Sequence, residues 1–256
     1  MPGTSTQAQW RQWRQWRVRV GEEETAALFE PALTSRAGSL FLCAHGAGGH
    51  MSDRGLLAST VSLRRRGLDV VRFNFLYRER GAKRPDPMPR LVECIAAVAT
   101  HARREVAAER LILGGRSMGG RAASMLAAEG FACDGLLLLA YPLHPAGRPE
   151  KLRAAHLGRI EVPVLCINGT RDALCRRDLM ERAIRPLGGR WTMHWLDGAD
   201  HGFHVLERSG RTDGDVLDEM ADAVDTWESA MQRRSGVAGE RDGITGGGYG
   251  LTGEGV

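Results

Sequence analysis

One stretch of sixteen residues, "LILGGRSMGGRAASML" at 111–126, restricts the fold more than any other part of the chain. It opens with an apolar run typical of a buried strand and closes with an alanine-rich segment typical of a helix. Between them, four glycines surround Ser117. Glycine lets the backbone turn tightly and lets other groups approach closely. The stretch therefore predicts a strand that passes through a sharp turn directly into a helix, with Ser117 exposed at the turn.

Along the rest of the chain, short apolar runs alternate with longer segments of helical pattern. This alternation is typical of a mostly parallel sheet covered by helices on both faces. Capping residues and prolines indicate helices that begin near 52–53, at 87 and at about 213, the last ending near 231. We predict an α/β fold with an eight-stranded sheet, its strands near 17–20, 25–29, 39–44, 68–75, 110–114, 135–141, 162–168 and 191–196.

The composition indicates one globular domain with unusual ends. The chain has 256 residues, of which 43% are hydrophobic and 26% charged, as in an ordinary water-soluble domain. We assign the domain to 16–231 and expect a flexible Trp/Arg-rich extension over 1–15 and a disordered glycine-rich tail over 232–256. The repeat "WRQWRQWR" has a three-residue period that matches neither helix nor strand. A frayed extension therefore fits it better than a nucleic-acid-binding element, the alternative that arginine and tryptophan suggest.

Cysteine usage and hydropathy indicate the compartment. The chain has five cysteines, an odd number, and none stand at metal-ligand spacing, so we expect a reducing environment and neither a metal nor a cofactor. The start lacks the apolar core of a signal peptide. The longest apolar run, "GLLLLAYPL", is far shorter than the roughly 20 residues of a membrane span. We therefore expect a cytoplasmic protein without a membrane partner. The net charge of +4 is scattered and does not favour nucleic acid as a partner.

Ser117 lies in the frame Gly115-x-Ser117-x-Gly119, the pattern of a nucleophile elbow. A serine hydroxyl becomes a good nucleophile only when a base removes its proton. We assign that base to His201, in the small-residue loop "GADHGF" that follows the last predicted strand. The other histidines fit less well. His194 lies within a predicted strand, whereas His101 lies within a helix and His204 at the start of one. His144 and His156 lie between strands and are weaker candidates.

The base needs a carboxylate that holds its tautomer, and the order serine, acid, histidine places that acid between Ser117 and His201. Asp172 follows a predicted strand in "GTRD", at the same end of the sheet as Ser117. Asp134 precedes a strand and so belongs to the opposite edge. Asp197 and Asp200 lie in the loop of His201 itself. We therefore predict that Asp172 is the acid.

Acyl transfer also requires N–H donors that stabilise a developing oxyanion. The segment "HGAGG" at 45–49 follows an early strand and is rich in glycine. We expect Ala47 or Gly48 to supply one N–H and Met118 the other. A phosphate-binding loop is the alternative, but it would require the pattern GxxxxGK[ST], and the segment has no such lysine.

Four motifs in this order resemble the α/β-hydrolase superfamily over about 17–230: "HGAGG", "GGRSMGG", "GTRD" and "GADHGF". Three further segments are similar to those of a small group related to dienelactone hydrolase: "YPLHPAGRPEKLRAAHL", and "HGAGGHMSD" paired with "FNFLYRERGAKRPDP". This group includes bacterial hydrolase-like proteins, a mammalian testis-expressed protein and a subunit of a histone acetyltransferase regulatory complex. The resemblance implies a triad of Ser117, Asp172 and His201. Dienelactone hydrolases proper use cysteine as nucleophile, so the serine here argues against that particular substrate.

These features predict a serine hydrolase, most simply a carboxylesterase that acts on short acyl esters of small molecules. Only about twenty residues separate the sixth and seventh predicted strands, too few for a large lid. A thioesterase or a peptidase with the same triad is an alternative. Another is a non-catalytic interaction protein on a hydrolase scaffold, which the complete set of predicted catalytic residues argues against. The sequence leaves the natural substrate and the oligomeric state open.

Overall fold

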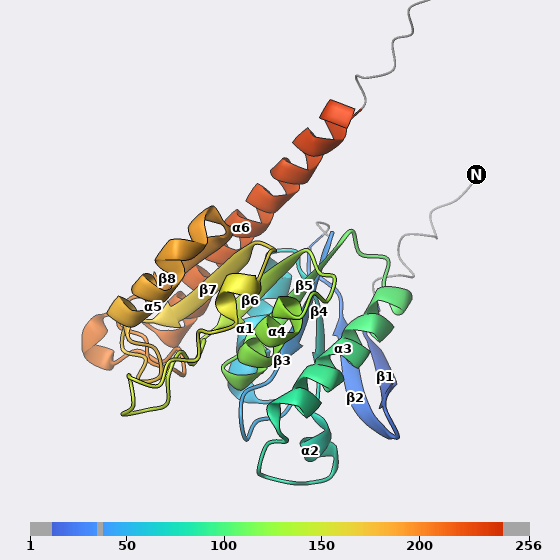
Figure 1. The fold of residues 1–256 in the computed structure, drawn as a ribbon, viewed down its shortest axis with the longest axis horizontal. Coiled ribbons are helices and arrows are strands. Elements are labelled where there is room, and N and C mark those ends of the chain that lie inside the picture. Colours follow the sequence, from blue (N-terminus) through green and yellow to red (C-terminus); the bar gives the residue numbers. More distant parts are fainter. Residues whose placement is uncertain (1–11, 35–37, 243–256) are drawn as a thin grey trace, which may run out of the picture.

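The structure is a computed structural model that describes residues 12–34 and 38–242 (Figure 1). Its strands form one sheet in the order β1-β2-β4-β3-β5-β6-β7-β8. The strands are β1 Arg14–Val20, β2 Glu23–Glu30, β3 Ser39–Ala44, β4 Asp69–Phe73, β5 Arg110–Arg116, β6 Gly135–Leu139, β7 Val164–Gly169 and β8 Trp191–Leu196. The α-helices are α1 Arg54–Arg65, α2 Leu76–Glu79, α3 Met88–Glu105, α4 Met118–Ala128, α5 Arg177–Ile184 and α6 Asp213–Asp242.

The sheet is parallel from β4 to β8, and β1 and β2 add an antiparallel edge. This arrangement confirms the predicted eight-stranded, mostly parallel α/β fold. In a parallel sheet the carboxyl ends of the strands lie at one edge, which is where such folds place their sites. The loops after β3, β5, β7 and β8 all leave from that edge.

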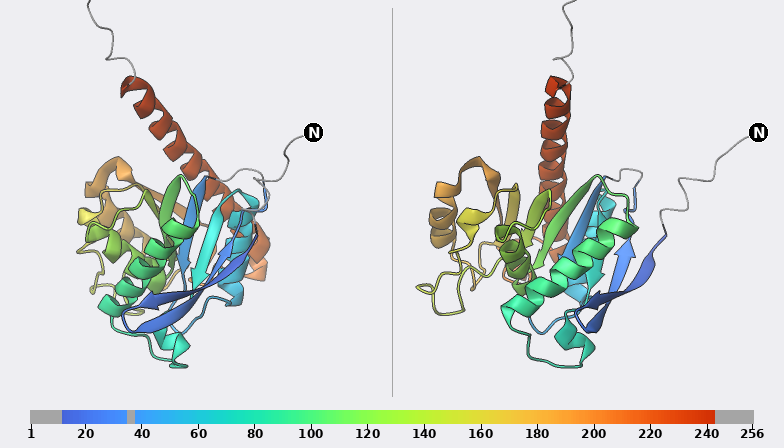
Figure 2. Two further views of the ribbon diagram at one scale, coloured as in Figure 1. Left: turned by 90° about the vertical axis from the view of Figure 1, so that its right-hand side faces the viewer. Right: turned by 45° about the vertical axis from the view of Figure 1, so that its right-hand side comes forward.

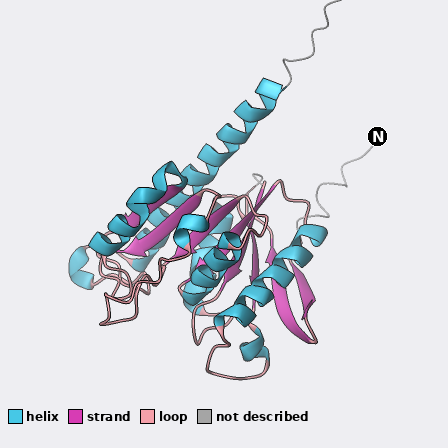
Figure 3. Cartoon of the chain, in the orientation of Figure 1, coloured by secondary structure: helices cyan, strands magenta, loops and turns pink. Residues whose placement is uncertain are grey.

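Helices cover both faces of the sheet, as predicted. In Figure 3, α3 and α4 cross in front of the strands while α6 passes behind them. Successive residues of each inner strand point to opposite faces, and both faces are buried. In β3, Leu42 packs in the core formed with α3 and α4, whereas its neighbour Phe41 packs in the core formed with α1 and α6. Both side chains are fully buried, which explains why these strands are continuous apolar runs.

The first strand begins at Arg14, three residues earlier than the sequence predicts, so part of the Trp/Arg repeat belongs to the sheet. The Trp16 ring stacks on Phe29 with a centroid separation of 6.0 Å. The Arg14 guanidinium lies 4.8 Å from the centroid of the same Phe29 ring. These contacts stabilise the pairing of β1 with β2, although the three-residue period of the repeat does not predict a strand. Residues 1–11, the rest of the predicted extension, lie outside the described residues.

The last helix is longer than predicted. It continues past residue 231 to Asp242, so that its C-terminal part extends beyond the sheet in both views of Figure 2. The prediction ended the helix where glycines begin and apolar residues become sparse. Adding a residue to an existing helix gains one hydrogen bond without a new nucleation cost, and this favours continuation. The tail predicted for 232–256 is therefore helical over its first eleven positions, 232–242, and the rest lies outside the described residues.

The connection from β6 to β7 contains a single 3-10 turn, Leu157–Arg159, and no inserted domain, which confirms the predicted minimal lid. In residues 12–34 and 38–242, no helix is both long and apolar enough to cross a bilayer.

Candidate active site

Ser117 occupies a strained turn between β5 and α4. Its φ of 51° and ψ of −116° are unusual for a residue with a side chain. The turn passes so close to β3 that a Cβ atom on Gly115 would lie 2.2 Å from the carbonyl oxygen of Ala44, and one on Gly119 would lie 2.6 Å from it. Glycine is therefore required on both sides of the serine. This geometry is the strand–turn–helix context that the sequence pattern predicts.

The structure brings the three predicted side chains into one hydrogen-bonded chain. Nε2 of His201 lies 2.9 Å from Oγ of Ser117. Nδ1 of His201 lies 2.9 Å and 2.8 Å from the two carboxylate oxygens of Asp172. Ser117 follows β5, Asp172 follows β7 and His201 follows β8, so three separate loops meet at the carboxyl edge of the sheet.

Asp172 is held as a buried acceptor. Its side chain is 0% exposed, whereas that of His201 is 29% exposed. Oδ1 also accepts the backbone N–H of Leu174 at 2.8 Å, and Oδ2 accepts the side-chain amide of Asn168 at 3.0 Å. Each carboxylate oxygen thus has a fixed donor in addition to His201. The sequence analysis missed Asn168, although a polar residue near the end of the apolar strand "VLCING" was a usable signal.

The rival carboxylates have other partners, in agreement with their predicted positions. Oδ1 of Asp200 accepts the backbone N–H groups of Gly202 and His204, at 2.7 Å and 3.0 Å, and so shapes the loop that carries His201. Asp197 contacts the hydroxyl of Thr170 at 3.3 Å. Asp134 accepts the N–H of Leu111 at the opposite edge of the sheet.

Most of the other histidines are engaged away from Ser117. Nε2 of His144 accepts the backbone N–H of Arg176 at 3.1 Å. His194 pairs with Glu219 at 2.9 Å. His204 pairs with Asp213 at 2.9 Å, and this carboxylate raises the pKa of the imidazole.

A second serine–histidine pair lies in the interior. Oγ of Ser124 is 2.7 Å from Nε2 of His156, but Ser124 is 0% exposed and His156 is 8% exposed. Burial lowers the pKa of His156 to about 4, so the imidazole is neutral at physiological pH. Among the described residues, no carboxylate bonds its other ring nitrogen, and neither residue lines the cavity at Ser117. The pair therefore has the properties of a buried structural hydrogen bond.

The glycine-rich loop after β3 is shaped by His45. Its Nδ1 lies 2.8 Å from the carbonyl oxygen of Gly46, and its Nε2 accepts the backbone N–H of Phe75 at 3.1 Å. These partners fix a neutral tautomer with the proton on Nδ1, and burial lowers the pKa of His45 to about 4. The imidazole thereby ties the start of the loop to the segment after β4.

The predicted oxyanion donors differ in their surroundings. Ala47 lines the cavity that contains Ser117 and His201. Met118 is the first residue of α4, where a backbone N–H has no partner within its own helix. Gly48 is outside that lining. Of the three residues, only Ala47 belongs to the lining of this cavity, and Met118 follows Ser117 directly at the start of α4.

The cavity at Ser117 has a volume of about 550 Å³. Side chains of α1, the loop after β3 and the loops of Asp172 and His201 surround it, together with Arg116. In the described part of the chain, no group of three or more His, Cys, Asp or Glu side chains is arranged to hold a metal ion.

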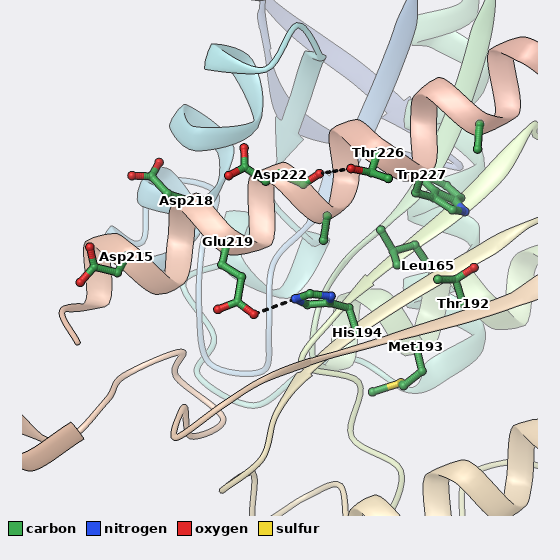
Figure 4. Close-up of a pocket in the computed structure, with 12 residues that line it drawn as sticks. Leu165, Thr192, Met193, His194, Asp215, Asp218, Glu219, Asp222, Thr226 and Trp227 are labelled. Atoms are coloured by element: carbon green, nitrogen blue, oxygen red, sulfur yellow. Dashed lines mark hydrogen bonds and ion pairs between the residues drawn. The ribbon is translucent and has the colours of Figure 1, made fainter. Parts of the chain in front are cut away.

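A larger cavity of about 770 Å³ lies between β8 and α6 (Figure 4). Figure 4 shows the His194–Glu219 pair facing it from the two elements, with Asp218 and Asp222 along α6. Its lining residues include no serine or cysteine. The lining of this cavity therefore contains no serine–histidine pair.

Residues 37–229 match the alpha/beta hydrolase domain family, and the chain belongs to that family. Solved structures with the same fold include an α/β serine hydrolase without a lid from Xanthomonas campestris, at 22% identity and a TM-score of 0.67 over 84% of this chain and 94% of that one. A serine hydrolase homologue from Coxiella burnetii is similar at 18% identity and a TM-score of 0.67, over 83% and 96% of the two chains. A dienelactone hydrolase from Anabaena variabilis is similar at 19% identity and a TM-score of 0.64, over 84% and 96%.

Proposed function

We propose that the protein is a serine hydrolase in which Ser117, His201 and Asp172 form the catalytic triad. The observation that supports this assignment most strongly is the hydrogen-bonded chain from Asp172 through His201 to Ser117 at a surface cavity. The strained backbone of Ser117 adds support, because strain of this kind costs about 1–3 kcal/mol and is concentrated at functional sites.

In the proposed reaction, Oγ of Ser117 attacks the carbonyl carbon of the substrate while Nε2 of His201 takes the hydroxyl proton. The buried carboxylate of Asp172 holds the proton on Nδ1 and stabilises the imidazolium that forms. The N–H groups of Ala47 and Met118 stabilise the oxyanion of the tetrahedral intermediate. His201 then protonates the leaving group, which leaves an acyl-enzyme. Water, activated by the same imidazole, releases the acid and restores Ser117.

We propose short acyl carboxylic esters as the substrate class. The cavity of about 550 Å³ is not covered by an inserted domain between β6 and β7, so no long apolar channel for a lipid chain is built over it. The same triad can attack a thioester or a peptide bond, and these remain the alternatives. The five cysteines are free thiols, which suits the proposed location in the reducing cytoplasm.

A fluorophosphonate probe tests this assignment, because an activated serine attacks phosphorus whatever its natural substrate. We expect stoichiometric labelling on Ser117, no labelling of Ser117→Ala and turnover of short p-nitrophenyl esters by the wild type. Labelling that persists in Ser117→Ala would show that the nucleophile is another residue. A folded wild type that is neither labelled nor active would favour the interaction scaffold. Parallel assays with thioesters and peptides separate the three hydrolase alternatives.

A further inference from the structure

Arg116 immediately precedes Ser117, and its side chain reaches across the site to the loop of the base. Nη2 of Arg116 donates to the backbone carbonyl oxygen of His201 at 2.8 Å. The guanidinium also lies 5.0 Å from the ring centroid of Phe203, a distance typical of a cation–π contact. One side chain therefore joins the strand that carries the nucleophile to the backbone that carries the base.

The other hydrogen bonds of this loop do not make that connection. Asp200 binds the N–H groups of Gly202 and His204, which fixes the internal shape of the loop. Arg171 donates to the carbonyl oxygen of Gly198 at 2.9 Å, which ties the loop to the segment after β7. Among the hydrogen bonds of the described residues, only that of Arg116 joins the loop to β5, apart from the Ser117–His201 contact itself.

The surroundings of Arg116 favour a fixed position. Among the described residues no ion pair within 4.0 Å holds its guanidinium, and the nearby carboxylates of Asp200, Asp172 and Asp53 attract it without direct contact. Burial lowers the pKa of its guanidinium, but arginine stays charged at any physiological pH. Its ring partner Phe203 is 2% exposed and has a φ of 63°, a conformation that a non-glycine residue rarely adopts. A buried, conformationally restricted aromatic ring gives the guanidinium a rigid platform.

We propose that Arg116 is a positioning residue that sets the distance between His201 and Ser117 by holding the carbonyl group of His201. This inference rests on the proposed function, since the distance matters only if the two side chains exchange a proton. Arg116 lines the cavity, but its hydrogen bond is to the backbone of the proposed base and not to the side chain of Ser117 or His201.

The test compares full-length Arg116→Met and Arg116→Lys with the wild type, using p-nitrophenyl acetate. Displacement of a catalytic group by about 1 Å can cost about 100-fold in rate. We expect Arg116→Met to lower kcat by about 10- to 100-fold while KM changes by less than about threefold, the pattern of a lost transition-state interaction. Arg116→Lys should recover part of kcat, because an ammonium group retains a charged donor.

Arg171→Met is the matched control, since it removes the same kind of arginine-to-carbonyl bond from the same loop at an exposed position. We expect it to keep kcat within about threefold of the wild type. An equal loss of kcat in Arg171→Met would overturn the inference, because the effect would then be general loosening of the loop. A rise in KM with unchanged kcat in Arg116→Met would also overturn it, because Arg116 would then bind substrate.

Hydrogen exchange of the backbone over 198–204 provides a readout that does not depend on activity. We expect faster exchange there in Arg116→Met, with unchanged exchange in β5 and β7. Unchanged exchange over 198–204 would overturn the inference even if the triad is correct. Absence of fluorophosphonate labelling in the wild type would instead overturn the proposed function. If Arg116→Met does not fold, the same comparisons apply to Arg116→Lys, for which slower turnover and faster exchange than in the wild type are still expected.

Discussion

The side-chain amide of Asn168 donates a hydrogen bond to Oδ2 of Asp172 at 3.0 Å. The same side chain accepts the backbone N–H of Tyr141 and donates to the backbone carbonyl of Tyr141, both at 3.1 Å. Asn168 is fully buried, so none of these bonds has water as a substitute. The carboxylate that faces His201 is thus fixed by a residue that also joins β7 to the segment after β6.

Replacing Asn168 by leucine should therefore affect stability and turnover together. The peptide groups of Tyr141 would lose their partners, and unsatisfied buried groups cost about 1–3 kcal/mol. Loss of the donor to Asp172 should also lower kcat, by about tenfold, because only the backbone N–H of Leu174 then orients the carboxylate toward His201. Urea denaturation and steady-state kinetics measure the two effects. A variant with wild-type midpoint and wild-type kcat would show that the buried amide supports neither.

The assignment of the acid is tested by Asp172→Asn. The amide favours the wrong imidazole tautomer, so we expect kcat to fall by a factor on the order of 10³ to 10⁴ while the circular dichroism spectrum is unchanged. Asp197→Asn is the control, because the carboxylate of Asp197 accepts the hydroxyl of Thr170 whereas His201 bonds Asp172. Loss of activity in Asp197→Asn with activity retained in Asp172→Asn would transfer the role to the other carboxylate.

We expect opposite results from substitutions in the two serine–histidine pairs, Ser117–His201 and Ser124–His156. Ser124→Ala should retain fluorophosphonate labelling and keep kcat within a few-fold, because Ser124 is fully buried and does not line the cavity. It should lower the free energy of unfolding by about 1 kcal/mol through loss of the bond to His156. Ser117→Ala should abolish labelling without that destabilisation. Labelling that depends on Ser124 would mean that the interior pair becomes accessible in solution.

Stability should fall as the pH drops from about 6.5 to about 4, because burial lowers the pKa of His156 from 6.5 to about 4 in the folded state. Within this window the unfolded chain binds a proton that the folded protein excludes, so protonation favours unfolding. One pKa unit corresponds to 1.36 kcal/mol, which gives about 3 kcal/mol for this residue as an upper bound.

The comparison that isolates this contribution is wild type against His156→Gln, in urea titrations at neutral and acidic pH. Carboxylates and His45, whose pKa burial also lowers to about 4, add to the loss of stability in both proteins, so the difference between the two slopes is the measure. A His156→Gln variant with the same loss of stability as the wild type would show that this imidazole does not titrate as its burial requires.

The sequence was sufficient for the features that depend on neighbouring residues. A glycine-flanked serine between an apolar run and an alanine-rich run predicted the turn at Ser117, and the ends of later strands predicted where Asp172 and His201 would lie. It was insufficient for contacts that join distant segments. The bond from Arg116 to the carbonyl of His201 spans 85 positions, and no property of either residue alone indicates it. Asn168 differs, because a polar residue in an apolar strand was a usable signal, but its partner Tyr141, 27 positions away, could not be identified from it.

The place of β8 in the sheet has a consequence for how the protein loses activity on heating. In the described sheet, β8 bonds only to β7, and the loop of His201 follows it directly. Strands at the border of a sheet open at a lower free energy than those at its centre. Fraying of this border would withdraw the imidazole while Ser117 stays in place on the central strand β5. We therefore expect hydrolytic activity to be lost on heating before the fold as a whole melts, because one peripheral strand carries the loop of the proposed base.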